Sequence, residues 1–185
     1  MTDDGATGKT AVDGPEPVAY QLKITLVDSE PVVWRRIVVP AEVSLQGLHS
    51  ILQRAMGWEN LHDYSFWLGV GSDRKSCDHT EHIAETISAA AGEPIYYSYD
   101  PQSGWLHRIE VEALEVSVAD TACLDGAAAC PPEGSGGVWG YDELLLRLED
   151  VEDPDYLELI EKYGDFDPDA FDLSAANARL AALEN

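Results

Sequence analysis

The chain has 185 residues, of which 45% are hydrophobic and 25% are charged. This length and apolar content suit a domain with a hydrophobic core and exclude an intrinsically disordered chain. Asp and Glu number 35 against 11 Lys and Arg, which gives a net charge of -24. A field of this sign repels phosphate backbones and anionic membranes, so direct binding to nucleic acid or to a membrane is not expected.

Residues 1–18 are rich in Gly, Pro, Thr and Asp and show no periodicity. They are predicted to form a disordered acidic tail. The start of the chain lacks the basic residues and the apolar stretch of a signal peptide, and no apolar run reaches the length of a membrane span. We therefore expect a cytoplasmic protein with a single domain over residues 19–183.

Alternating apolar residues predict two strands, at 19–27 and 32–39. The turn residues at 28–31 join them, which favours an antiparallel hairpin. Because side chains alternate along a strand, Trp34 and Arg36 are expected on one face of the second strand, opposite Val33, Arg35 and Ile37.

Apolar residues at helical spacing predict a helix over 45–56. Ser44 is a favourable N-cap for this helix, and Gly57 supplies the residue that stops it. Alternation then predicts a third strand at 63–70, and a polar loop follows at 71–82.

The pattern next predicts a short helix at 83–91, two strands at 95–99 and 105–118, and a Gly- and Pro-rich loop at 119–140. Three helices are expected near the end of the chain, at 141–148, 154–163 and 173–183. The order β-β-α-β-(α)-β-β with a C-terminal helical segment predicts an α+β fold. Its antiparallel or mixed sheet would carry the helices on its faces.

Sequence motifs of the commonest enzyme classes are absent. The chain contains no glycine-rich phosphate loop, no GxSxG nucleophile turn and no HExxH zinc motif. Cysteine and histidine remain as candidate zinc ligands, in a metal-binding domain or a metal-dependent hydrolase. The candidates are Cys77, His79 and His82 in one group, and Cys123 and Cys130 with His62 or His107 in the other. The alternatives are a polar surface loop and buried thiols.

Aromatic and basic side chains on the predicted strands, together with the loop at 130–141, suggest a shallow binding groove. The candidate residues are Trp34, Arg36, Trp105, His107, Glu133, Trp139 and Tyr141. Such a groove in an otherwise acidic chain would take a protein or a small anionic ligand. The alternative is that the rings pack in the core and the arginine stems cover apolar surface.

Several segments, taken in order, resemble the plasmid pRiA4b ORF-3-like family over roughly residues 19–180. The segments are Val33–Pro40, Leu48-His49, Ala55–Trp58, His62–Phe66, Tyr99–His107, Cys123–Tyr141, Asp167–Asp172 and Asn177. The resemblance implies an α+β domain of roll-like architecture and an association with plasmids and insertion elements. Some members carry a transposon-resolvase style label, and the family implies no established activity.

One turn departs from the family pattern, which usually reads Tyr-Asp-Phe-Gly-Asp-Gly/Ser-Trp-Glu-His. Here the segment from Tyr99 to His107 reads YDPQSGWLH, so an acidic site on this turn is not expected. The sequence as a whole predicts a non-enzymatic binding module. The alternatives are the metal-dependent protein described above and an accessory factor in DNA transposition or recombination.

Overall fold

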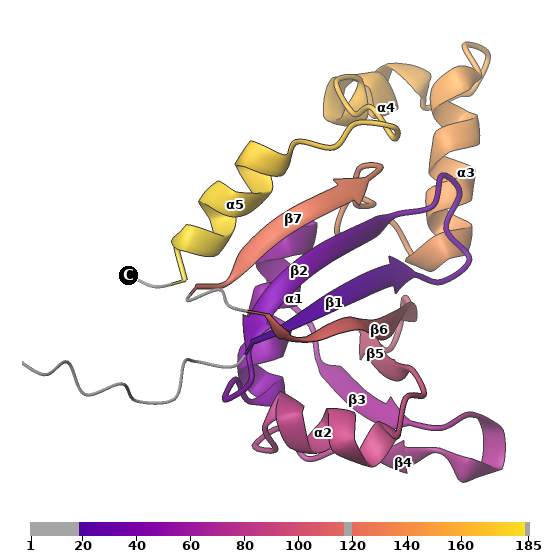
Figure 1. The fold of residues 1–185 in the computed structure, drawn as a ribbon. Helices are drawn as coiled ribbons and strands as arrows, with labels where there is room; N and C mark the ends of the chain where they lie inside the picture. Colours follow the sequence, from indigo (N-terminus) through magenta and orange to yellow (C-terminus); the bar gives the residue numbers. More distant parts are fainter. Residues whose placement is uncertain (1–18, 117–119, 184–185) are drawn as a thin grey trace, which may run out of the picture.

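The computed structural model describes residues 19–116 and 120–183, and the predicted tail at 1–18 lies outside this range. Seven antiparallel strands form one sheet in the order β4-β3-β5-β6-β1-β2-β7 (Figure 1). The strands are β1 (Ala19–Leu26), β2 (Trp34–Pro40), β3 (Tyr64–Leu68), β4 (Lys75–Ser76), β5 (Ile95–Tyr99), β6 (Trp105–Val116) and β7 (Ala122–Ala127).

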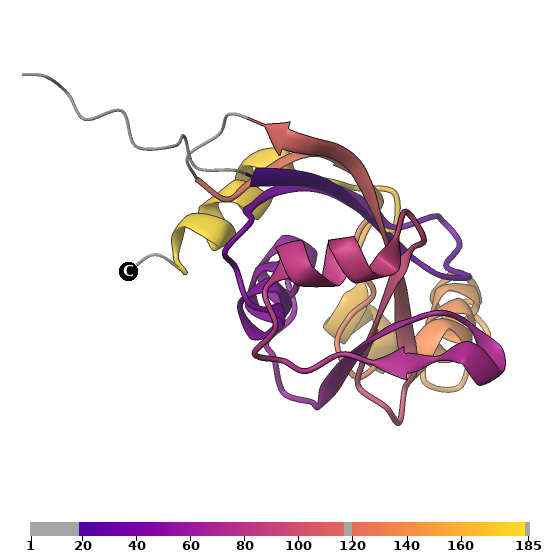
Figure 2. The ribbon, with the colours of Figure 1, turned by 60° about the horizontal axis from the view of Figure 1, so that its bottom comes forward.

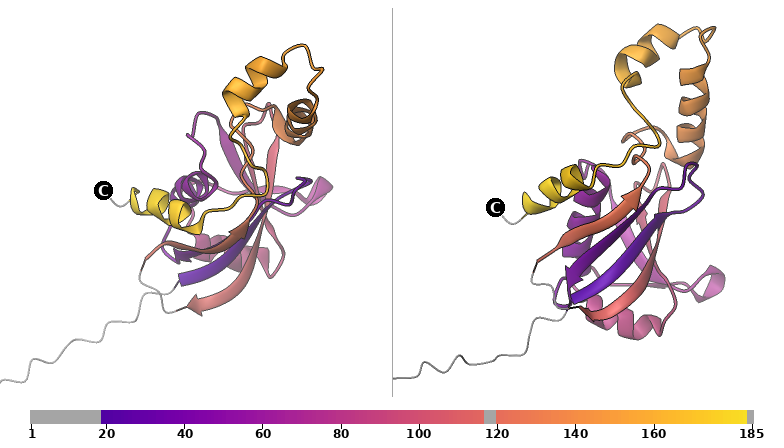
Figure 3. Two further views of the ribbon diagram at one scale, coloured as in Figure 1. Left: turned by 90° about the horizontal axis from the view of Figure 1, so that it is seen from above. Right: turned by 45° about the horizontal axis from the view of Figure 1, so that its top comes forward.

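Five helices accompany the sheet in the described residues. They are α1 (Leu45–Met56), α2 (Ile83–Ala90), α3 (Gly137–Glu149), α4 (Tyr156–Tyr163) and α5 (Leu173–Ala181). The sheet curves around α1, which packs against β2 and α5 (Figure 2). Helix α2 lies at one end of the molecule, whereas α3 and α4 pack together and project from the other end (Figure 3). The predicted α+β fold is confirmed.

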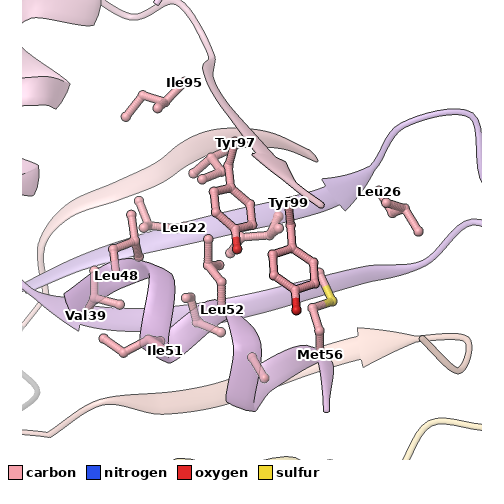
Figure 4. Close-up of a cluster of buried hydrophobic side chains, with 14 of the residues drawn as sticks. Leu22, Leu26, Val39, Leu48, Ile51, Leu52, Met56, Ile95, Tyr97 and Tyr99 are labelled. Atoms are coloured by element: carbon pink, nitrogen blue, oxygen red, sulfur yellow. The ribbon is translucent and has the colours of Figure 1, made fainter. Parts of the chain in front are cut away.

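Helix α1 supplies the centre of the core. Its buried side chains face those of β1, β2 and β5, and Tyr97 and Tyr99 of β5 reach toward Leu52 and Met56 of the helix (Figure 4). Both of its predicted ends are confirmed. The Ser44 side chain accepts a hydrogen bond from the Gly47 amide, and Gly57 adopts a left-handed conformation with φ 94°.

The pairing of β1, β2 and β6 defines an inner and an outer face of the sheet. Leu26 pairs with His107 and Ile24 pairs with Arg35, and all four side chains are buried on the inner face. Lys23 pairs with Arg36 on the outer face. The predicted alternation along β2 is therefore confirmed.

Two predicted loops contain strands. Residues 122–127 form the edge strand β7, although Asp and Gly favour turns over strands. The Asn177 side chain of α5 both donates to and accepts from the backbone of Cys123, at 2.9 Å each. These bonds pair both backbone groups of Cys123 on the free edge of β7, so tertiary contacts outweigh local preference here. The two-residue strand β4 was also missed, and α3 begins at Gly137 rather than at residue 141.

Candidate functional site

Trp34 and Arg36 lie on the outer face of β2, inside a network of charges. Arg36 donates to Glu112 at 2.9 Å and to Asp125 at 3.2 Å. The hydrogen bond from Arg36 lowers the pKa of Glu112 to about 2. Lys23 and Arg36 lie over the Trp34 ring, at 5.2 and 5.1 Å from its centroid. An anion at Arg36 would have to compete with two carboxylates that already hold it.

Trp105 and His107 lie on the inner face of β6, and both are completely buried. They contact Trp58, the residue that follows the left-handed Gly57. The Trp58 ring centroid is 5.0 Å from Tyr99, 5.7 Å from Trp105 and 5.4 Å from His107. We call these four rings the Trp58 cluster. The Trp58 indole N–H donates to the Pro131 carbonyl at 3.0 Å, which ties the cluster to the loop after β7.

Several buried polar atoms of the Trp58 cluster and of α3 lack a hydrogen-bond partner among the described residues. These atoms are Trp105 Nε1, both ring nitrogens of His107 and the Tyr141 hydroxyl. Burial lowers the pKa of His107 to about 4, so this side chain is neutral at pH 7. A neutral histidine with no path to the surface offers no charge to a bound anion.

Glu133 lies at the surface beside the Trp58 cluster. It accepts hydrogen bonds from the Tyr99 hydroxyl and from the Glu59 amide. Glu133 and Gly57 line two shallow depressions of about 350 Å³ each, one on either side. The carboxylate therefore anchors the loop after β7 to β5 and to the residues after α1.

The candidate metal ligands do not converge. No group of three or more His, Cys, Asp or Glu side chains within residues 19–116 and 120–183 is arranged to hold a metal ion. His62 lies 3.8 Å from Asp100, whereas Cys123 and Cys130 lie near the buried Arg35. Desolvation raises the pKa of both thiols, that of Cys130 to about 12, and a protonated thiol is a poor zinc ligand.

The other candidate group is divided among structural roles. The His79 ring stacks on Tyr64 at 4.5 Å between centroids. His82 caps the N-terminus of α2 and lies 3.3 Å from Glu42. Cys77 packs against the hydrophobic core, and desolvation raises the pKa of its thiol. Each side chain therefore has a local contact of its own, separate from the others.

Trp139 differs from the other candidate residues because 86% of its surface is exposed. It lies in the first turn of α3, beside a depression of about 430 Å³. We call this region the Trp139 surface, and its lining residues are Val27, Asp28, Ser103, Gly104, Leu106, Val138, Trp139 and Asp142. They come from the turn after β1, the turn before β6, the beginning of β6 and the start of α3.

Gly137 fixes how closely these segments approach. A Cβ atom at this position would lie 2.1 Å from the carbonyl oxygen of Ser103, and Gly137 has φ +79°. Only glycine tolerates both conditions. The glycine lets α3 begin directly against the turn before β6, and Trp139 consequently stands two residues further on, at the rim of the depression.

The predicted groove is therefore divided among four places. Trp34 and Arg36 lie on the outer face, and Trp105, His107 and Tyr141 lie in the interior. Glu133 lies at the surface beside the Trp58 cluster, and Trp139 lies at the base of α3. The sequence interpretation missed Trp58 as the centre of the buried rings and missed Asp28 and Asp142 beside Trp139. The spacing of Trp139 and Asp142, three residues apart on a helix, places both on one side of α3 and was the available signal.

The described helices include none that is both long and apolar enough to cross a bilayer. The fold and these sites define an antiparallel α+β domain, and residues 18–175 match the model of the plasmid pRiA4b ORF-3-like protein family. The chain belongs to this family.

Two relatives extend the comparison. The chain is 34% identical over 168 residues to "Uncharacterized protein y4hQ" of Sinorhizobium fredii (strain NBRC 101917 / NGR234), and the match covers 85% of each chain. It also resembles the crystal structure of a protein of unknown function, MM3350 from Methanosarcina mazei Go1. That match has a TM-score of 0.74 and 29% identity, and it covers 85% of this chain and 97% of the other. The family and fold predictions are confirmed, and the names of these relatives indicate neither an activity nor a specific role.

Proposed function

We propose that this protein is a non-enzymatic binding module that docks another protein on the Trp139 surface. The observation that carries the proposal is the exposure of Trp139, 86%, beside a depression of about 430 Å³. Tryptophan buries a large area with few rotatable bonds, so it is enriched among the residues that dominate binding energy at protein interfaces.

The neighbouring face of α3 supports the same reading. Leu146 follows Trp139 by seven residues, two helical turns, and 70% of its surface is exposed. Residues at this spacing share one side of a helix. The depression and the exposed side of α3 together combine apolar side chains with polar ones, as protein interfaces usually do.

The other candidate functions have less support. A zinc-dependent role would need ligands that converge, and the described residues do not offer such a group. An accessory role in DNA transposition stays a prediction. It would act through a protein partner, because a net charge of -24 opposes contact with DNA. Docking on the Trp139 surface is compatible with that role and does not require it.

The test compares two exposed side chains on neighbouring helices. Trp139→Ala removes the proposed anchor, whereas Leu157→Ala removes a side chain of α4 that is 82% exposed and lies outside the depression. Tagged wild-type protein and both variants are used to capture partners from cells of the source organism. We expect a partner that is retained by Leu157→Ala and weakened about 10-fold or more by Trp139→Ala, the loss typical of an interface anchor. Equal recovery by all three proteins would contradict the proposal.

A further inference from the structure

Two other tryptophans on the sheet lie beneath cations of the same chain. Lys23 and Arg36 lie over Trp34, at 5.2 and 5.1 Å from its centroid. The Arg74 guanidinium lies 3.6 Å from the centroid of Trp67 and helps to bury that ring to 8% exposure. A cation over an indole face is attracted by the electron-rich ring. In this chain the combination of ring and cation is thus used repeatedly.

Trp139 lacks such a cation. Within the part of the chain that the structure describes, no Lys or Arg lies over its ring and none lines the depression. The ionisable residues of the depression are instead two acids, Asp28 and Asp142. Neither carboxylate has a hydrogen-bond or ion-pair partner among the described residues.

The side chains of the Trp139 surface therefore match a cation that the chain itself does not supply. A guanidinium or ammonium group in the depression would meet an indole face and two unpaired carboxylates. The apolar stem of the same side chain, or its neighbour, would contact Val27, Leu106 and Val138. The net charge of -24 extends this preference over a longer range and would speed the approach of a basic partner.

We infer that the Trp139 surface recognises a basic segment of its partner, with an Arg or Lys inserted between Trp139, Asp28 and Asp142 and an apolar residue beside it. This inference rests on the proposed function, and it adds the chemistry of the partner. It also replaces the anionic ligand expected from the sequence with a cationic one, since Arg36 is already held by carboxylates and Trp139 is flanked by them.

The test uses three short peptides and NMR. The peptides are acetyl-Gly-Arg-Leu-Gly-amide, the same peptide with citrulline in place of arginine, and the same peptide with glutamate. Citrulline keeps the shape of arginine and removes its charge. The reporter is the indole N–H resonance of Trp139, assigned as the signal lost in Trp139→Phe. We expect the arginine peptide to shift this resonance and to bind about five-fold more tightly than the citrulline peptide, the range of one exposed ion pair combined with a cation–π contact.

Matched charge variants separate local contacts from the general field. Asp28→Asn combined with Asp142→Asn should remove most of the difference in affinity between the arginine and citrulline peptides, and the part that remains is due to the cation–π contact with Trp139. Glu158→Gln combined with Glu161→Gln removes the same charge from exposed positions of α4 that lie outside the depression, and should leave most of the difference in place. Raising the salt concentration should weaken the arginine peptide alone.

Two outcomes would overturn the inference. One is equal affinity for the arginine and citrulline peptides. In that case the preference for a basic segment would be wrong, whereas the proposed function, docking of a protein on the Trp139 surface, would still stand. The other is the absence of any shift at Trp139 with all three peptides. The capture experiment with Trp139→Ala then decides separately whether a partner docks on this surface at all.

Discussion

The Trp58 cluster and the Trp139 surface are both built around a tryptophan that follows a glycine within two residues, yet the environments of the two rings are opposite. Gly57 ends α1 and turns Trp58 inward, where three rings lie within 5.7 Å of it. Gly137 begins α3 and leaves Trp139 outside, with 86% of its surface exposed. A glycine directly before the ring accompanies burial in one place, and a glycine two residues before the ring accompanies exposure in the other.

The direction in which the chain leaves the glycine therefore determines whether the tryptophan ring is buried or exposed. Trp58 follows a helix whose buried face points into the curved sheet, so its ring continues the core. Trp139 lies on a helix that projects beyond the end of the sheet (Figure 1). Its ring has no second layer to pack against.

The largest expected difference between the two regions is in the free energy of unfolding when each tryptophan is replaced by alanine. We expect Trp58→Ala to lower the free energy of unfolding by about 3–5 kcal/mol, because a large buried ring is replaced by a cavity. Trp139→Ala should change it by less than about 0.5 kcal/mol, as is usual for an exposed site. Urea denaturation followed by far-UV circular dichroism measures both values. A loss above about 1.5 kcal/mol for Trp139→Ala would mean that this ring has a structural role.

A smaller effect should appear in the pH dependence of stability. Burial lowers the pKa of His107 in the folded state to about 4, whereas an unfolded histidine titrates near ~6.5. The unfolded state therefore binds more protons between these two values. Stability is fully present above about pH 6.5 and decreases as the pH falls toward 4. We expect a loss of about 1–1.5 kcal/mol from this residue between pH 6.5 and 5.

The contribution of His107 is separated from that of other groups by comparing the wild type with His107→Gln. The quantity compared is the slope of the unfolding free energy against pH. His107→Gln should reduce the dependence of unfolding free energy on pH in this window, whatever its effect on absolute stability. A residual slope is expected from His49, whose pKa burial also lowers. The pH window ends at 5 because carboxylates, including Glu112, contribute below it. Identical slopes for the wild type and His107→Gln would show that His107 is accessible to protons in the folded state.

The smallest expected effect is a difference between Trp139 and Trp105 in how readily acrylamide quenches their fluorescence. This measurement reports the exposure of each ring and does not depend on a change in the free energy of unfolding. Acrylamide is neutral, so the negative charge of the protein does not repel it. Trp139→Phe should remove the emission that acrylamide quenches most readily, and Trp105→Phe should remove emission that it quenches poorly. If Trp139→Phe left the quenched fraction unchanged, the ring would be shielded in solution and the Trp139 surface would not be open.

The central helix and strands of the fold could be predicted from the sequence because the patterns that specify them are local. Helix α1 carries its own apolar periodicity and both of its end residues, and β1 and β2 carry a clear alternation. Strand β7 could not be predicted in this way. Its sequence contains Asp125 and Gly126, and it is held by Asn177, which lies 54 residues from Cys123. Strand pairing at that separation depends on the whole fold.

The candidate site shows the same limit. The sequence identified Trp34, Arg36, Trp105, His107 and Trp139 as notable, and the alternation placed Arg36 on the face opposite to Arg35. It could not assign an inner or an outer face to strands from different parts of the chain. The pairing of Leu26 with His107 and of Lys23 with Arg36 made that assignment.

The sequence by itself determined the acidity, the family, the α+β class and most helix and strand positions, because each follows from composition, motif order or local periodicity. Only the tertiary structure decided that Trp105 and His107 are buried, that Arg36 is neutralised by Glu112 and Asp125, and that Trp139 stands in solvent beside Asp28 and Asp142. The physical reason is that burial and charge pairing depend on which distant segments meet. Periodicity reports only how a segment divides its own side chains between two faces.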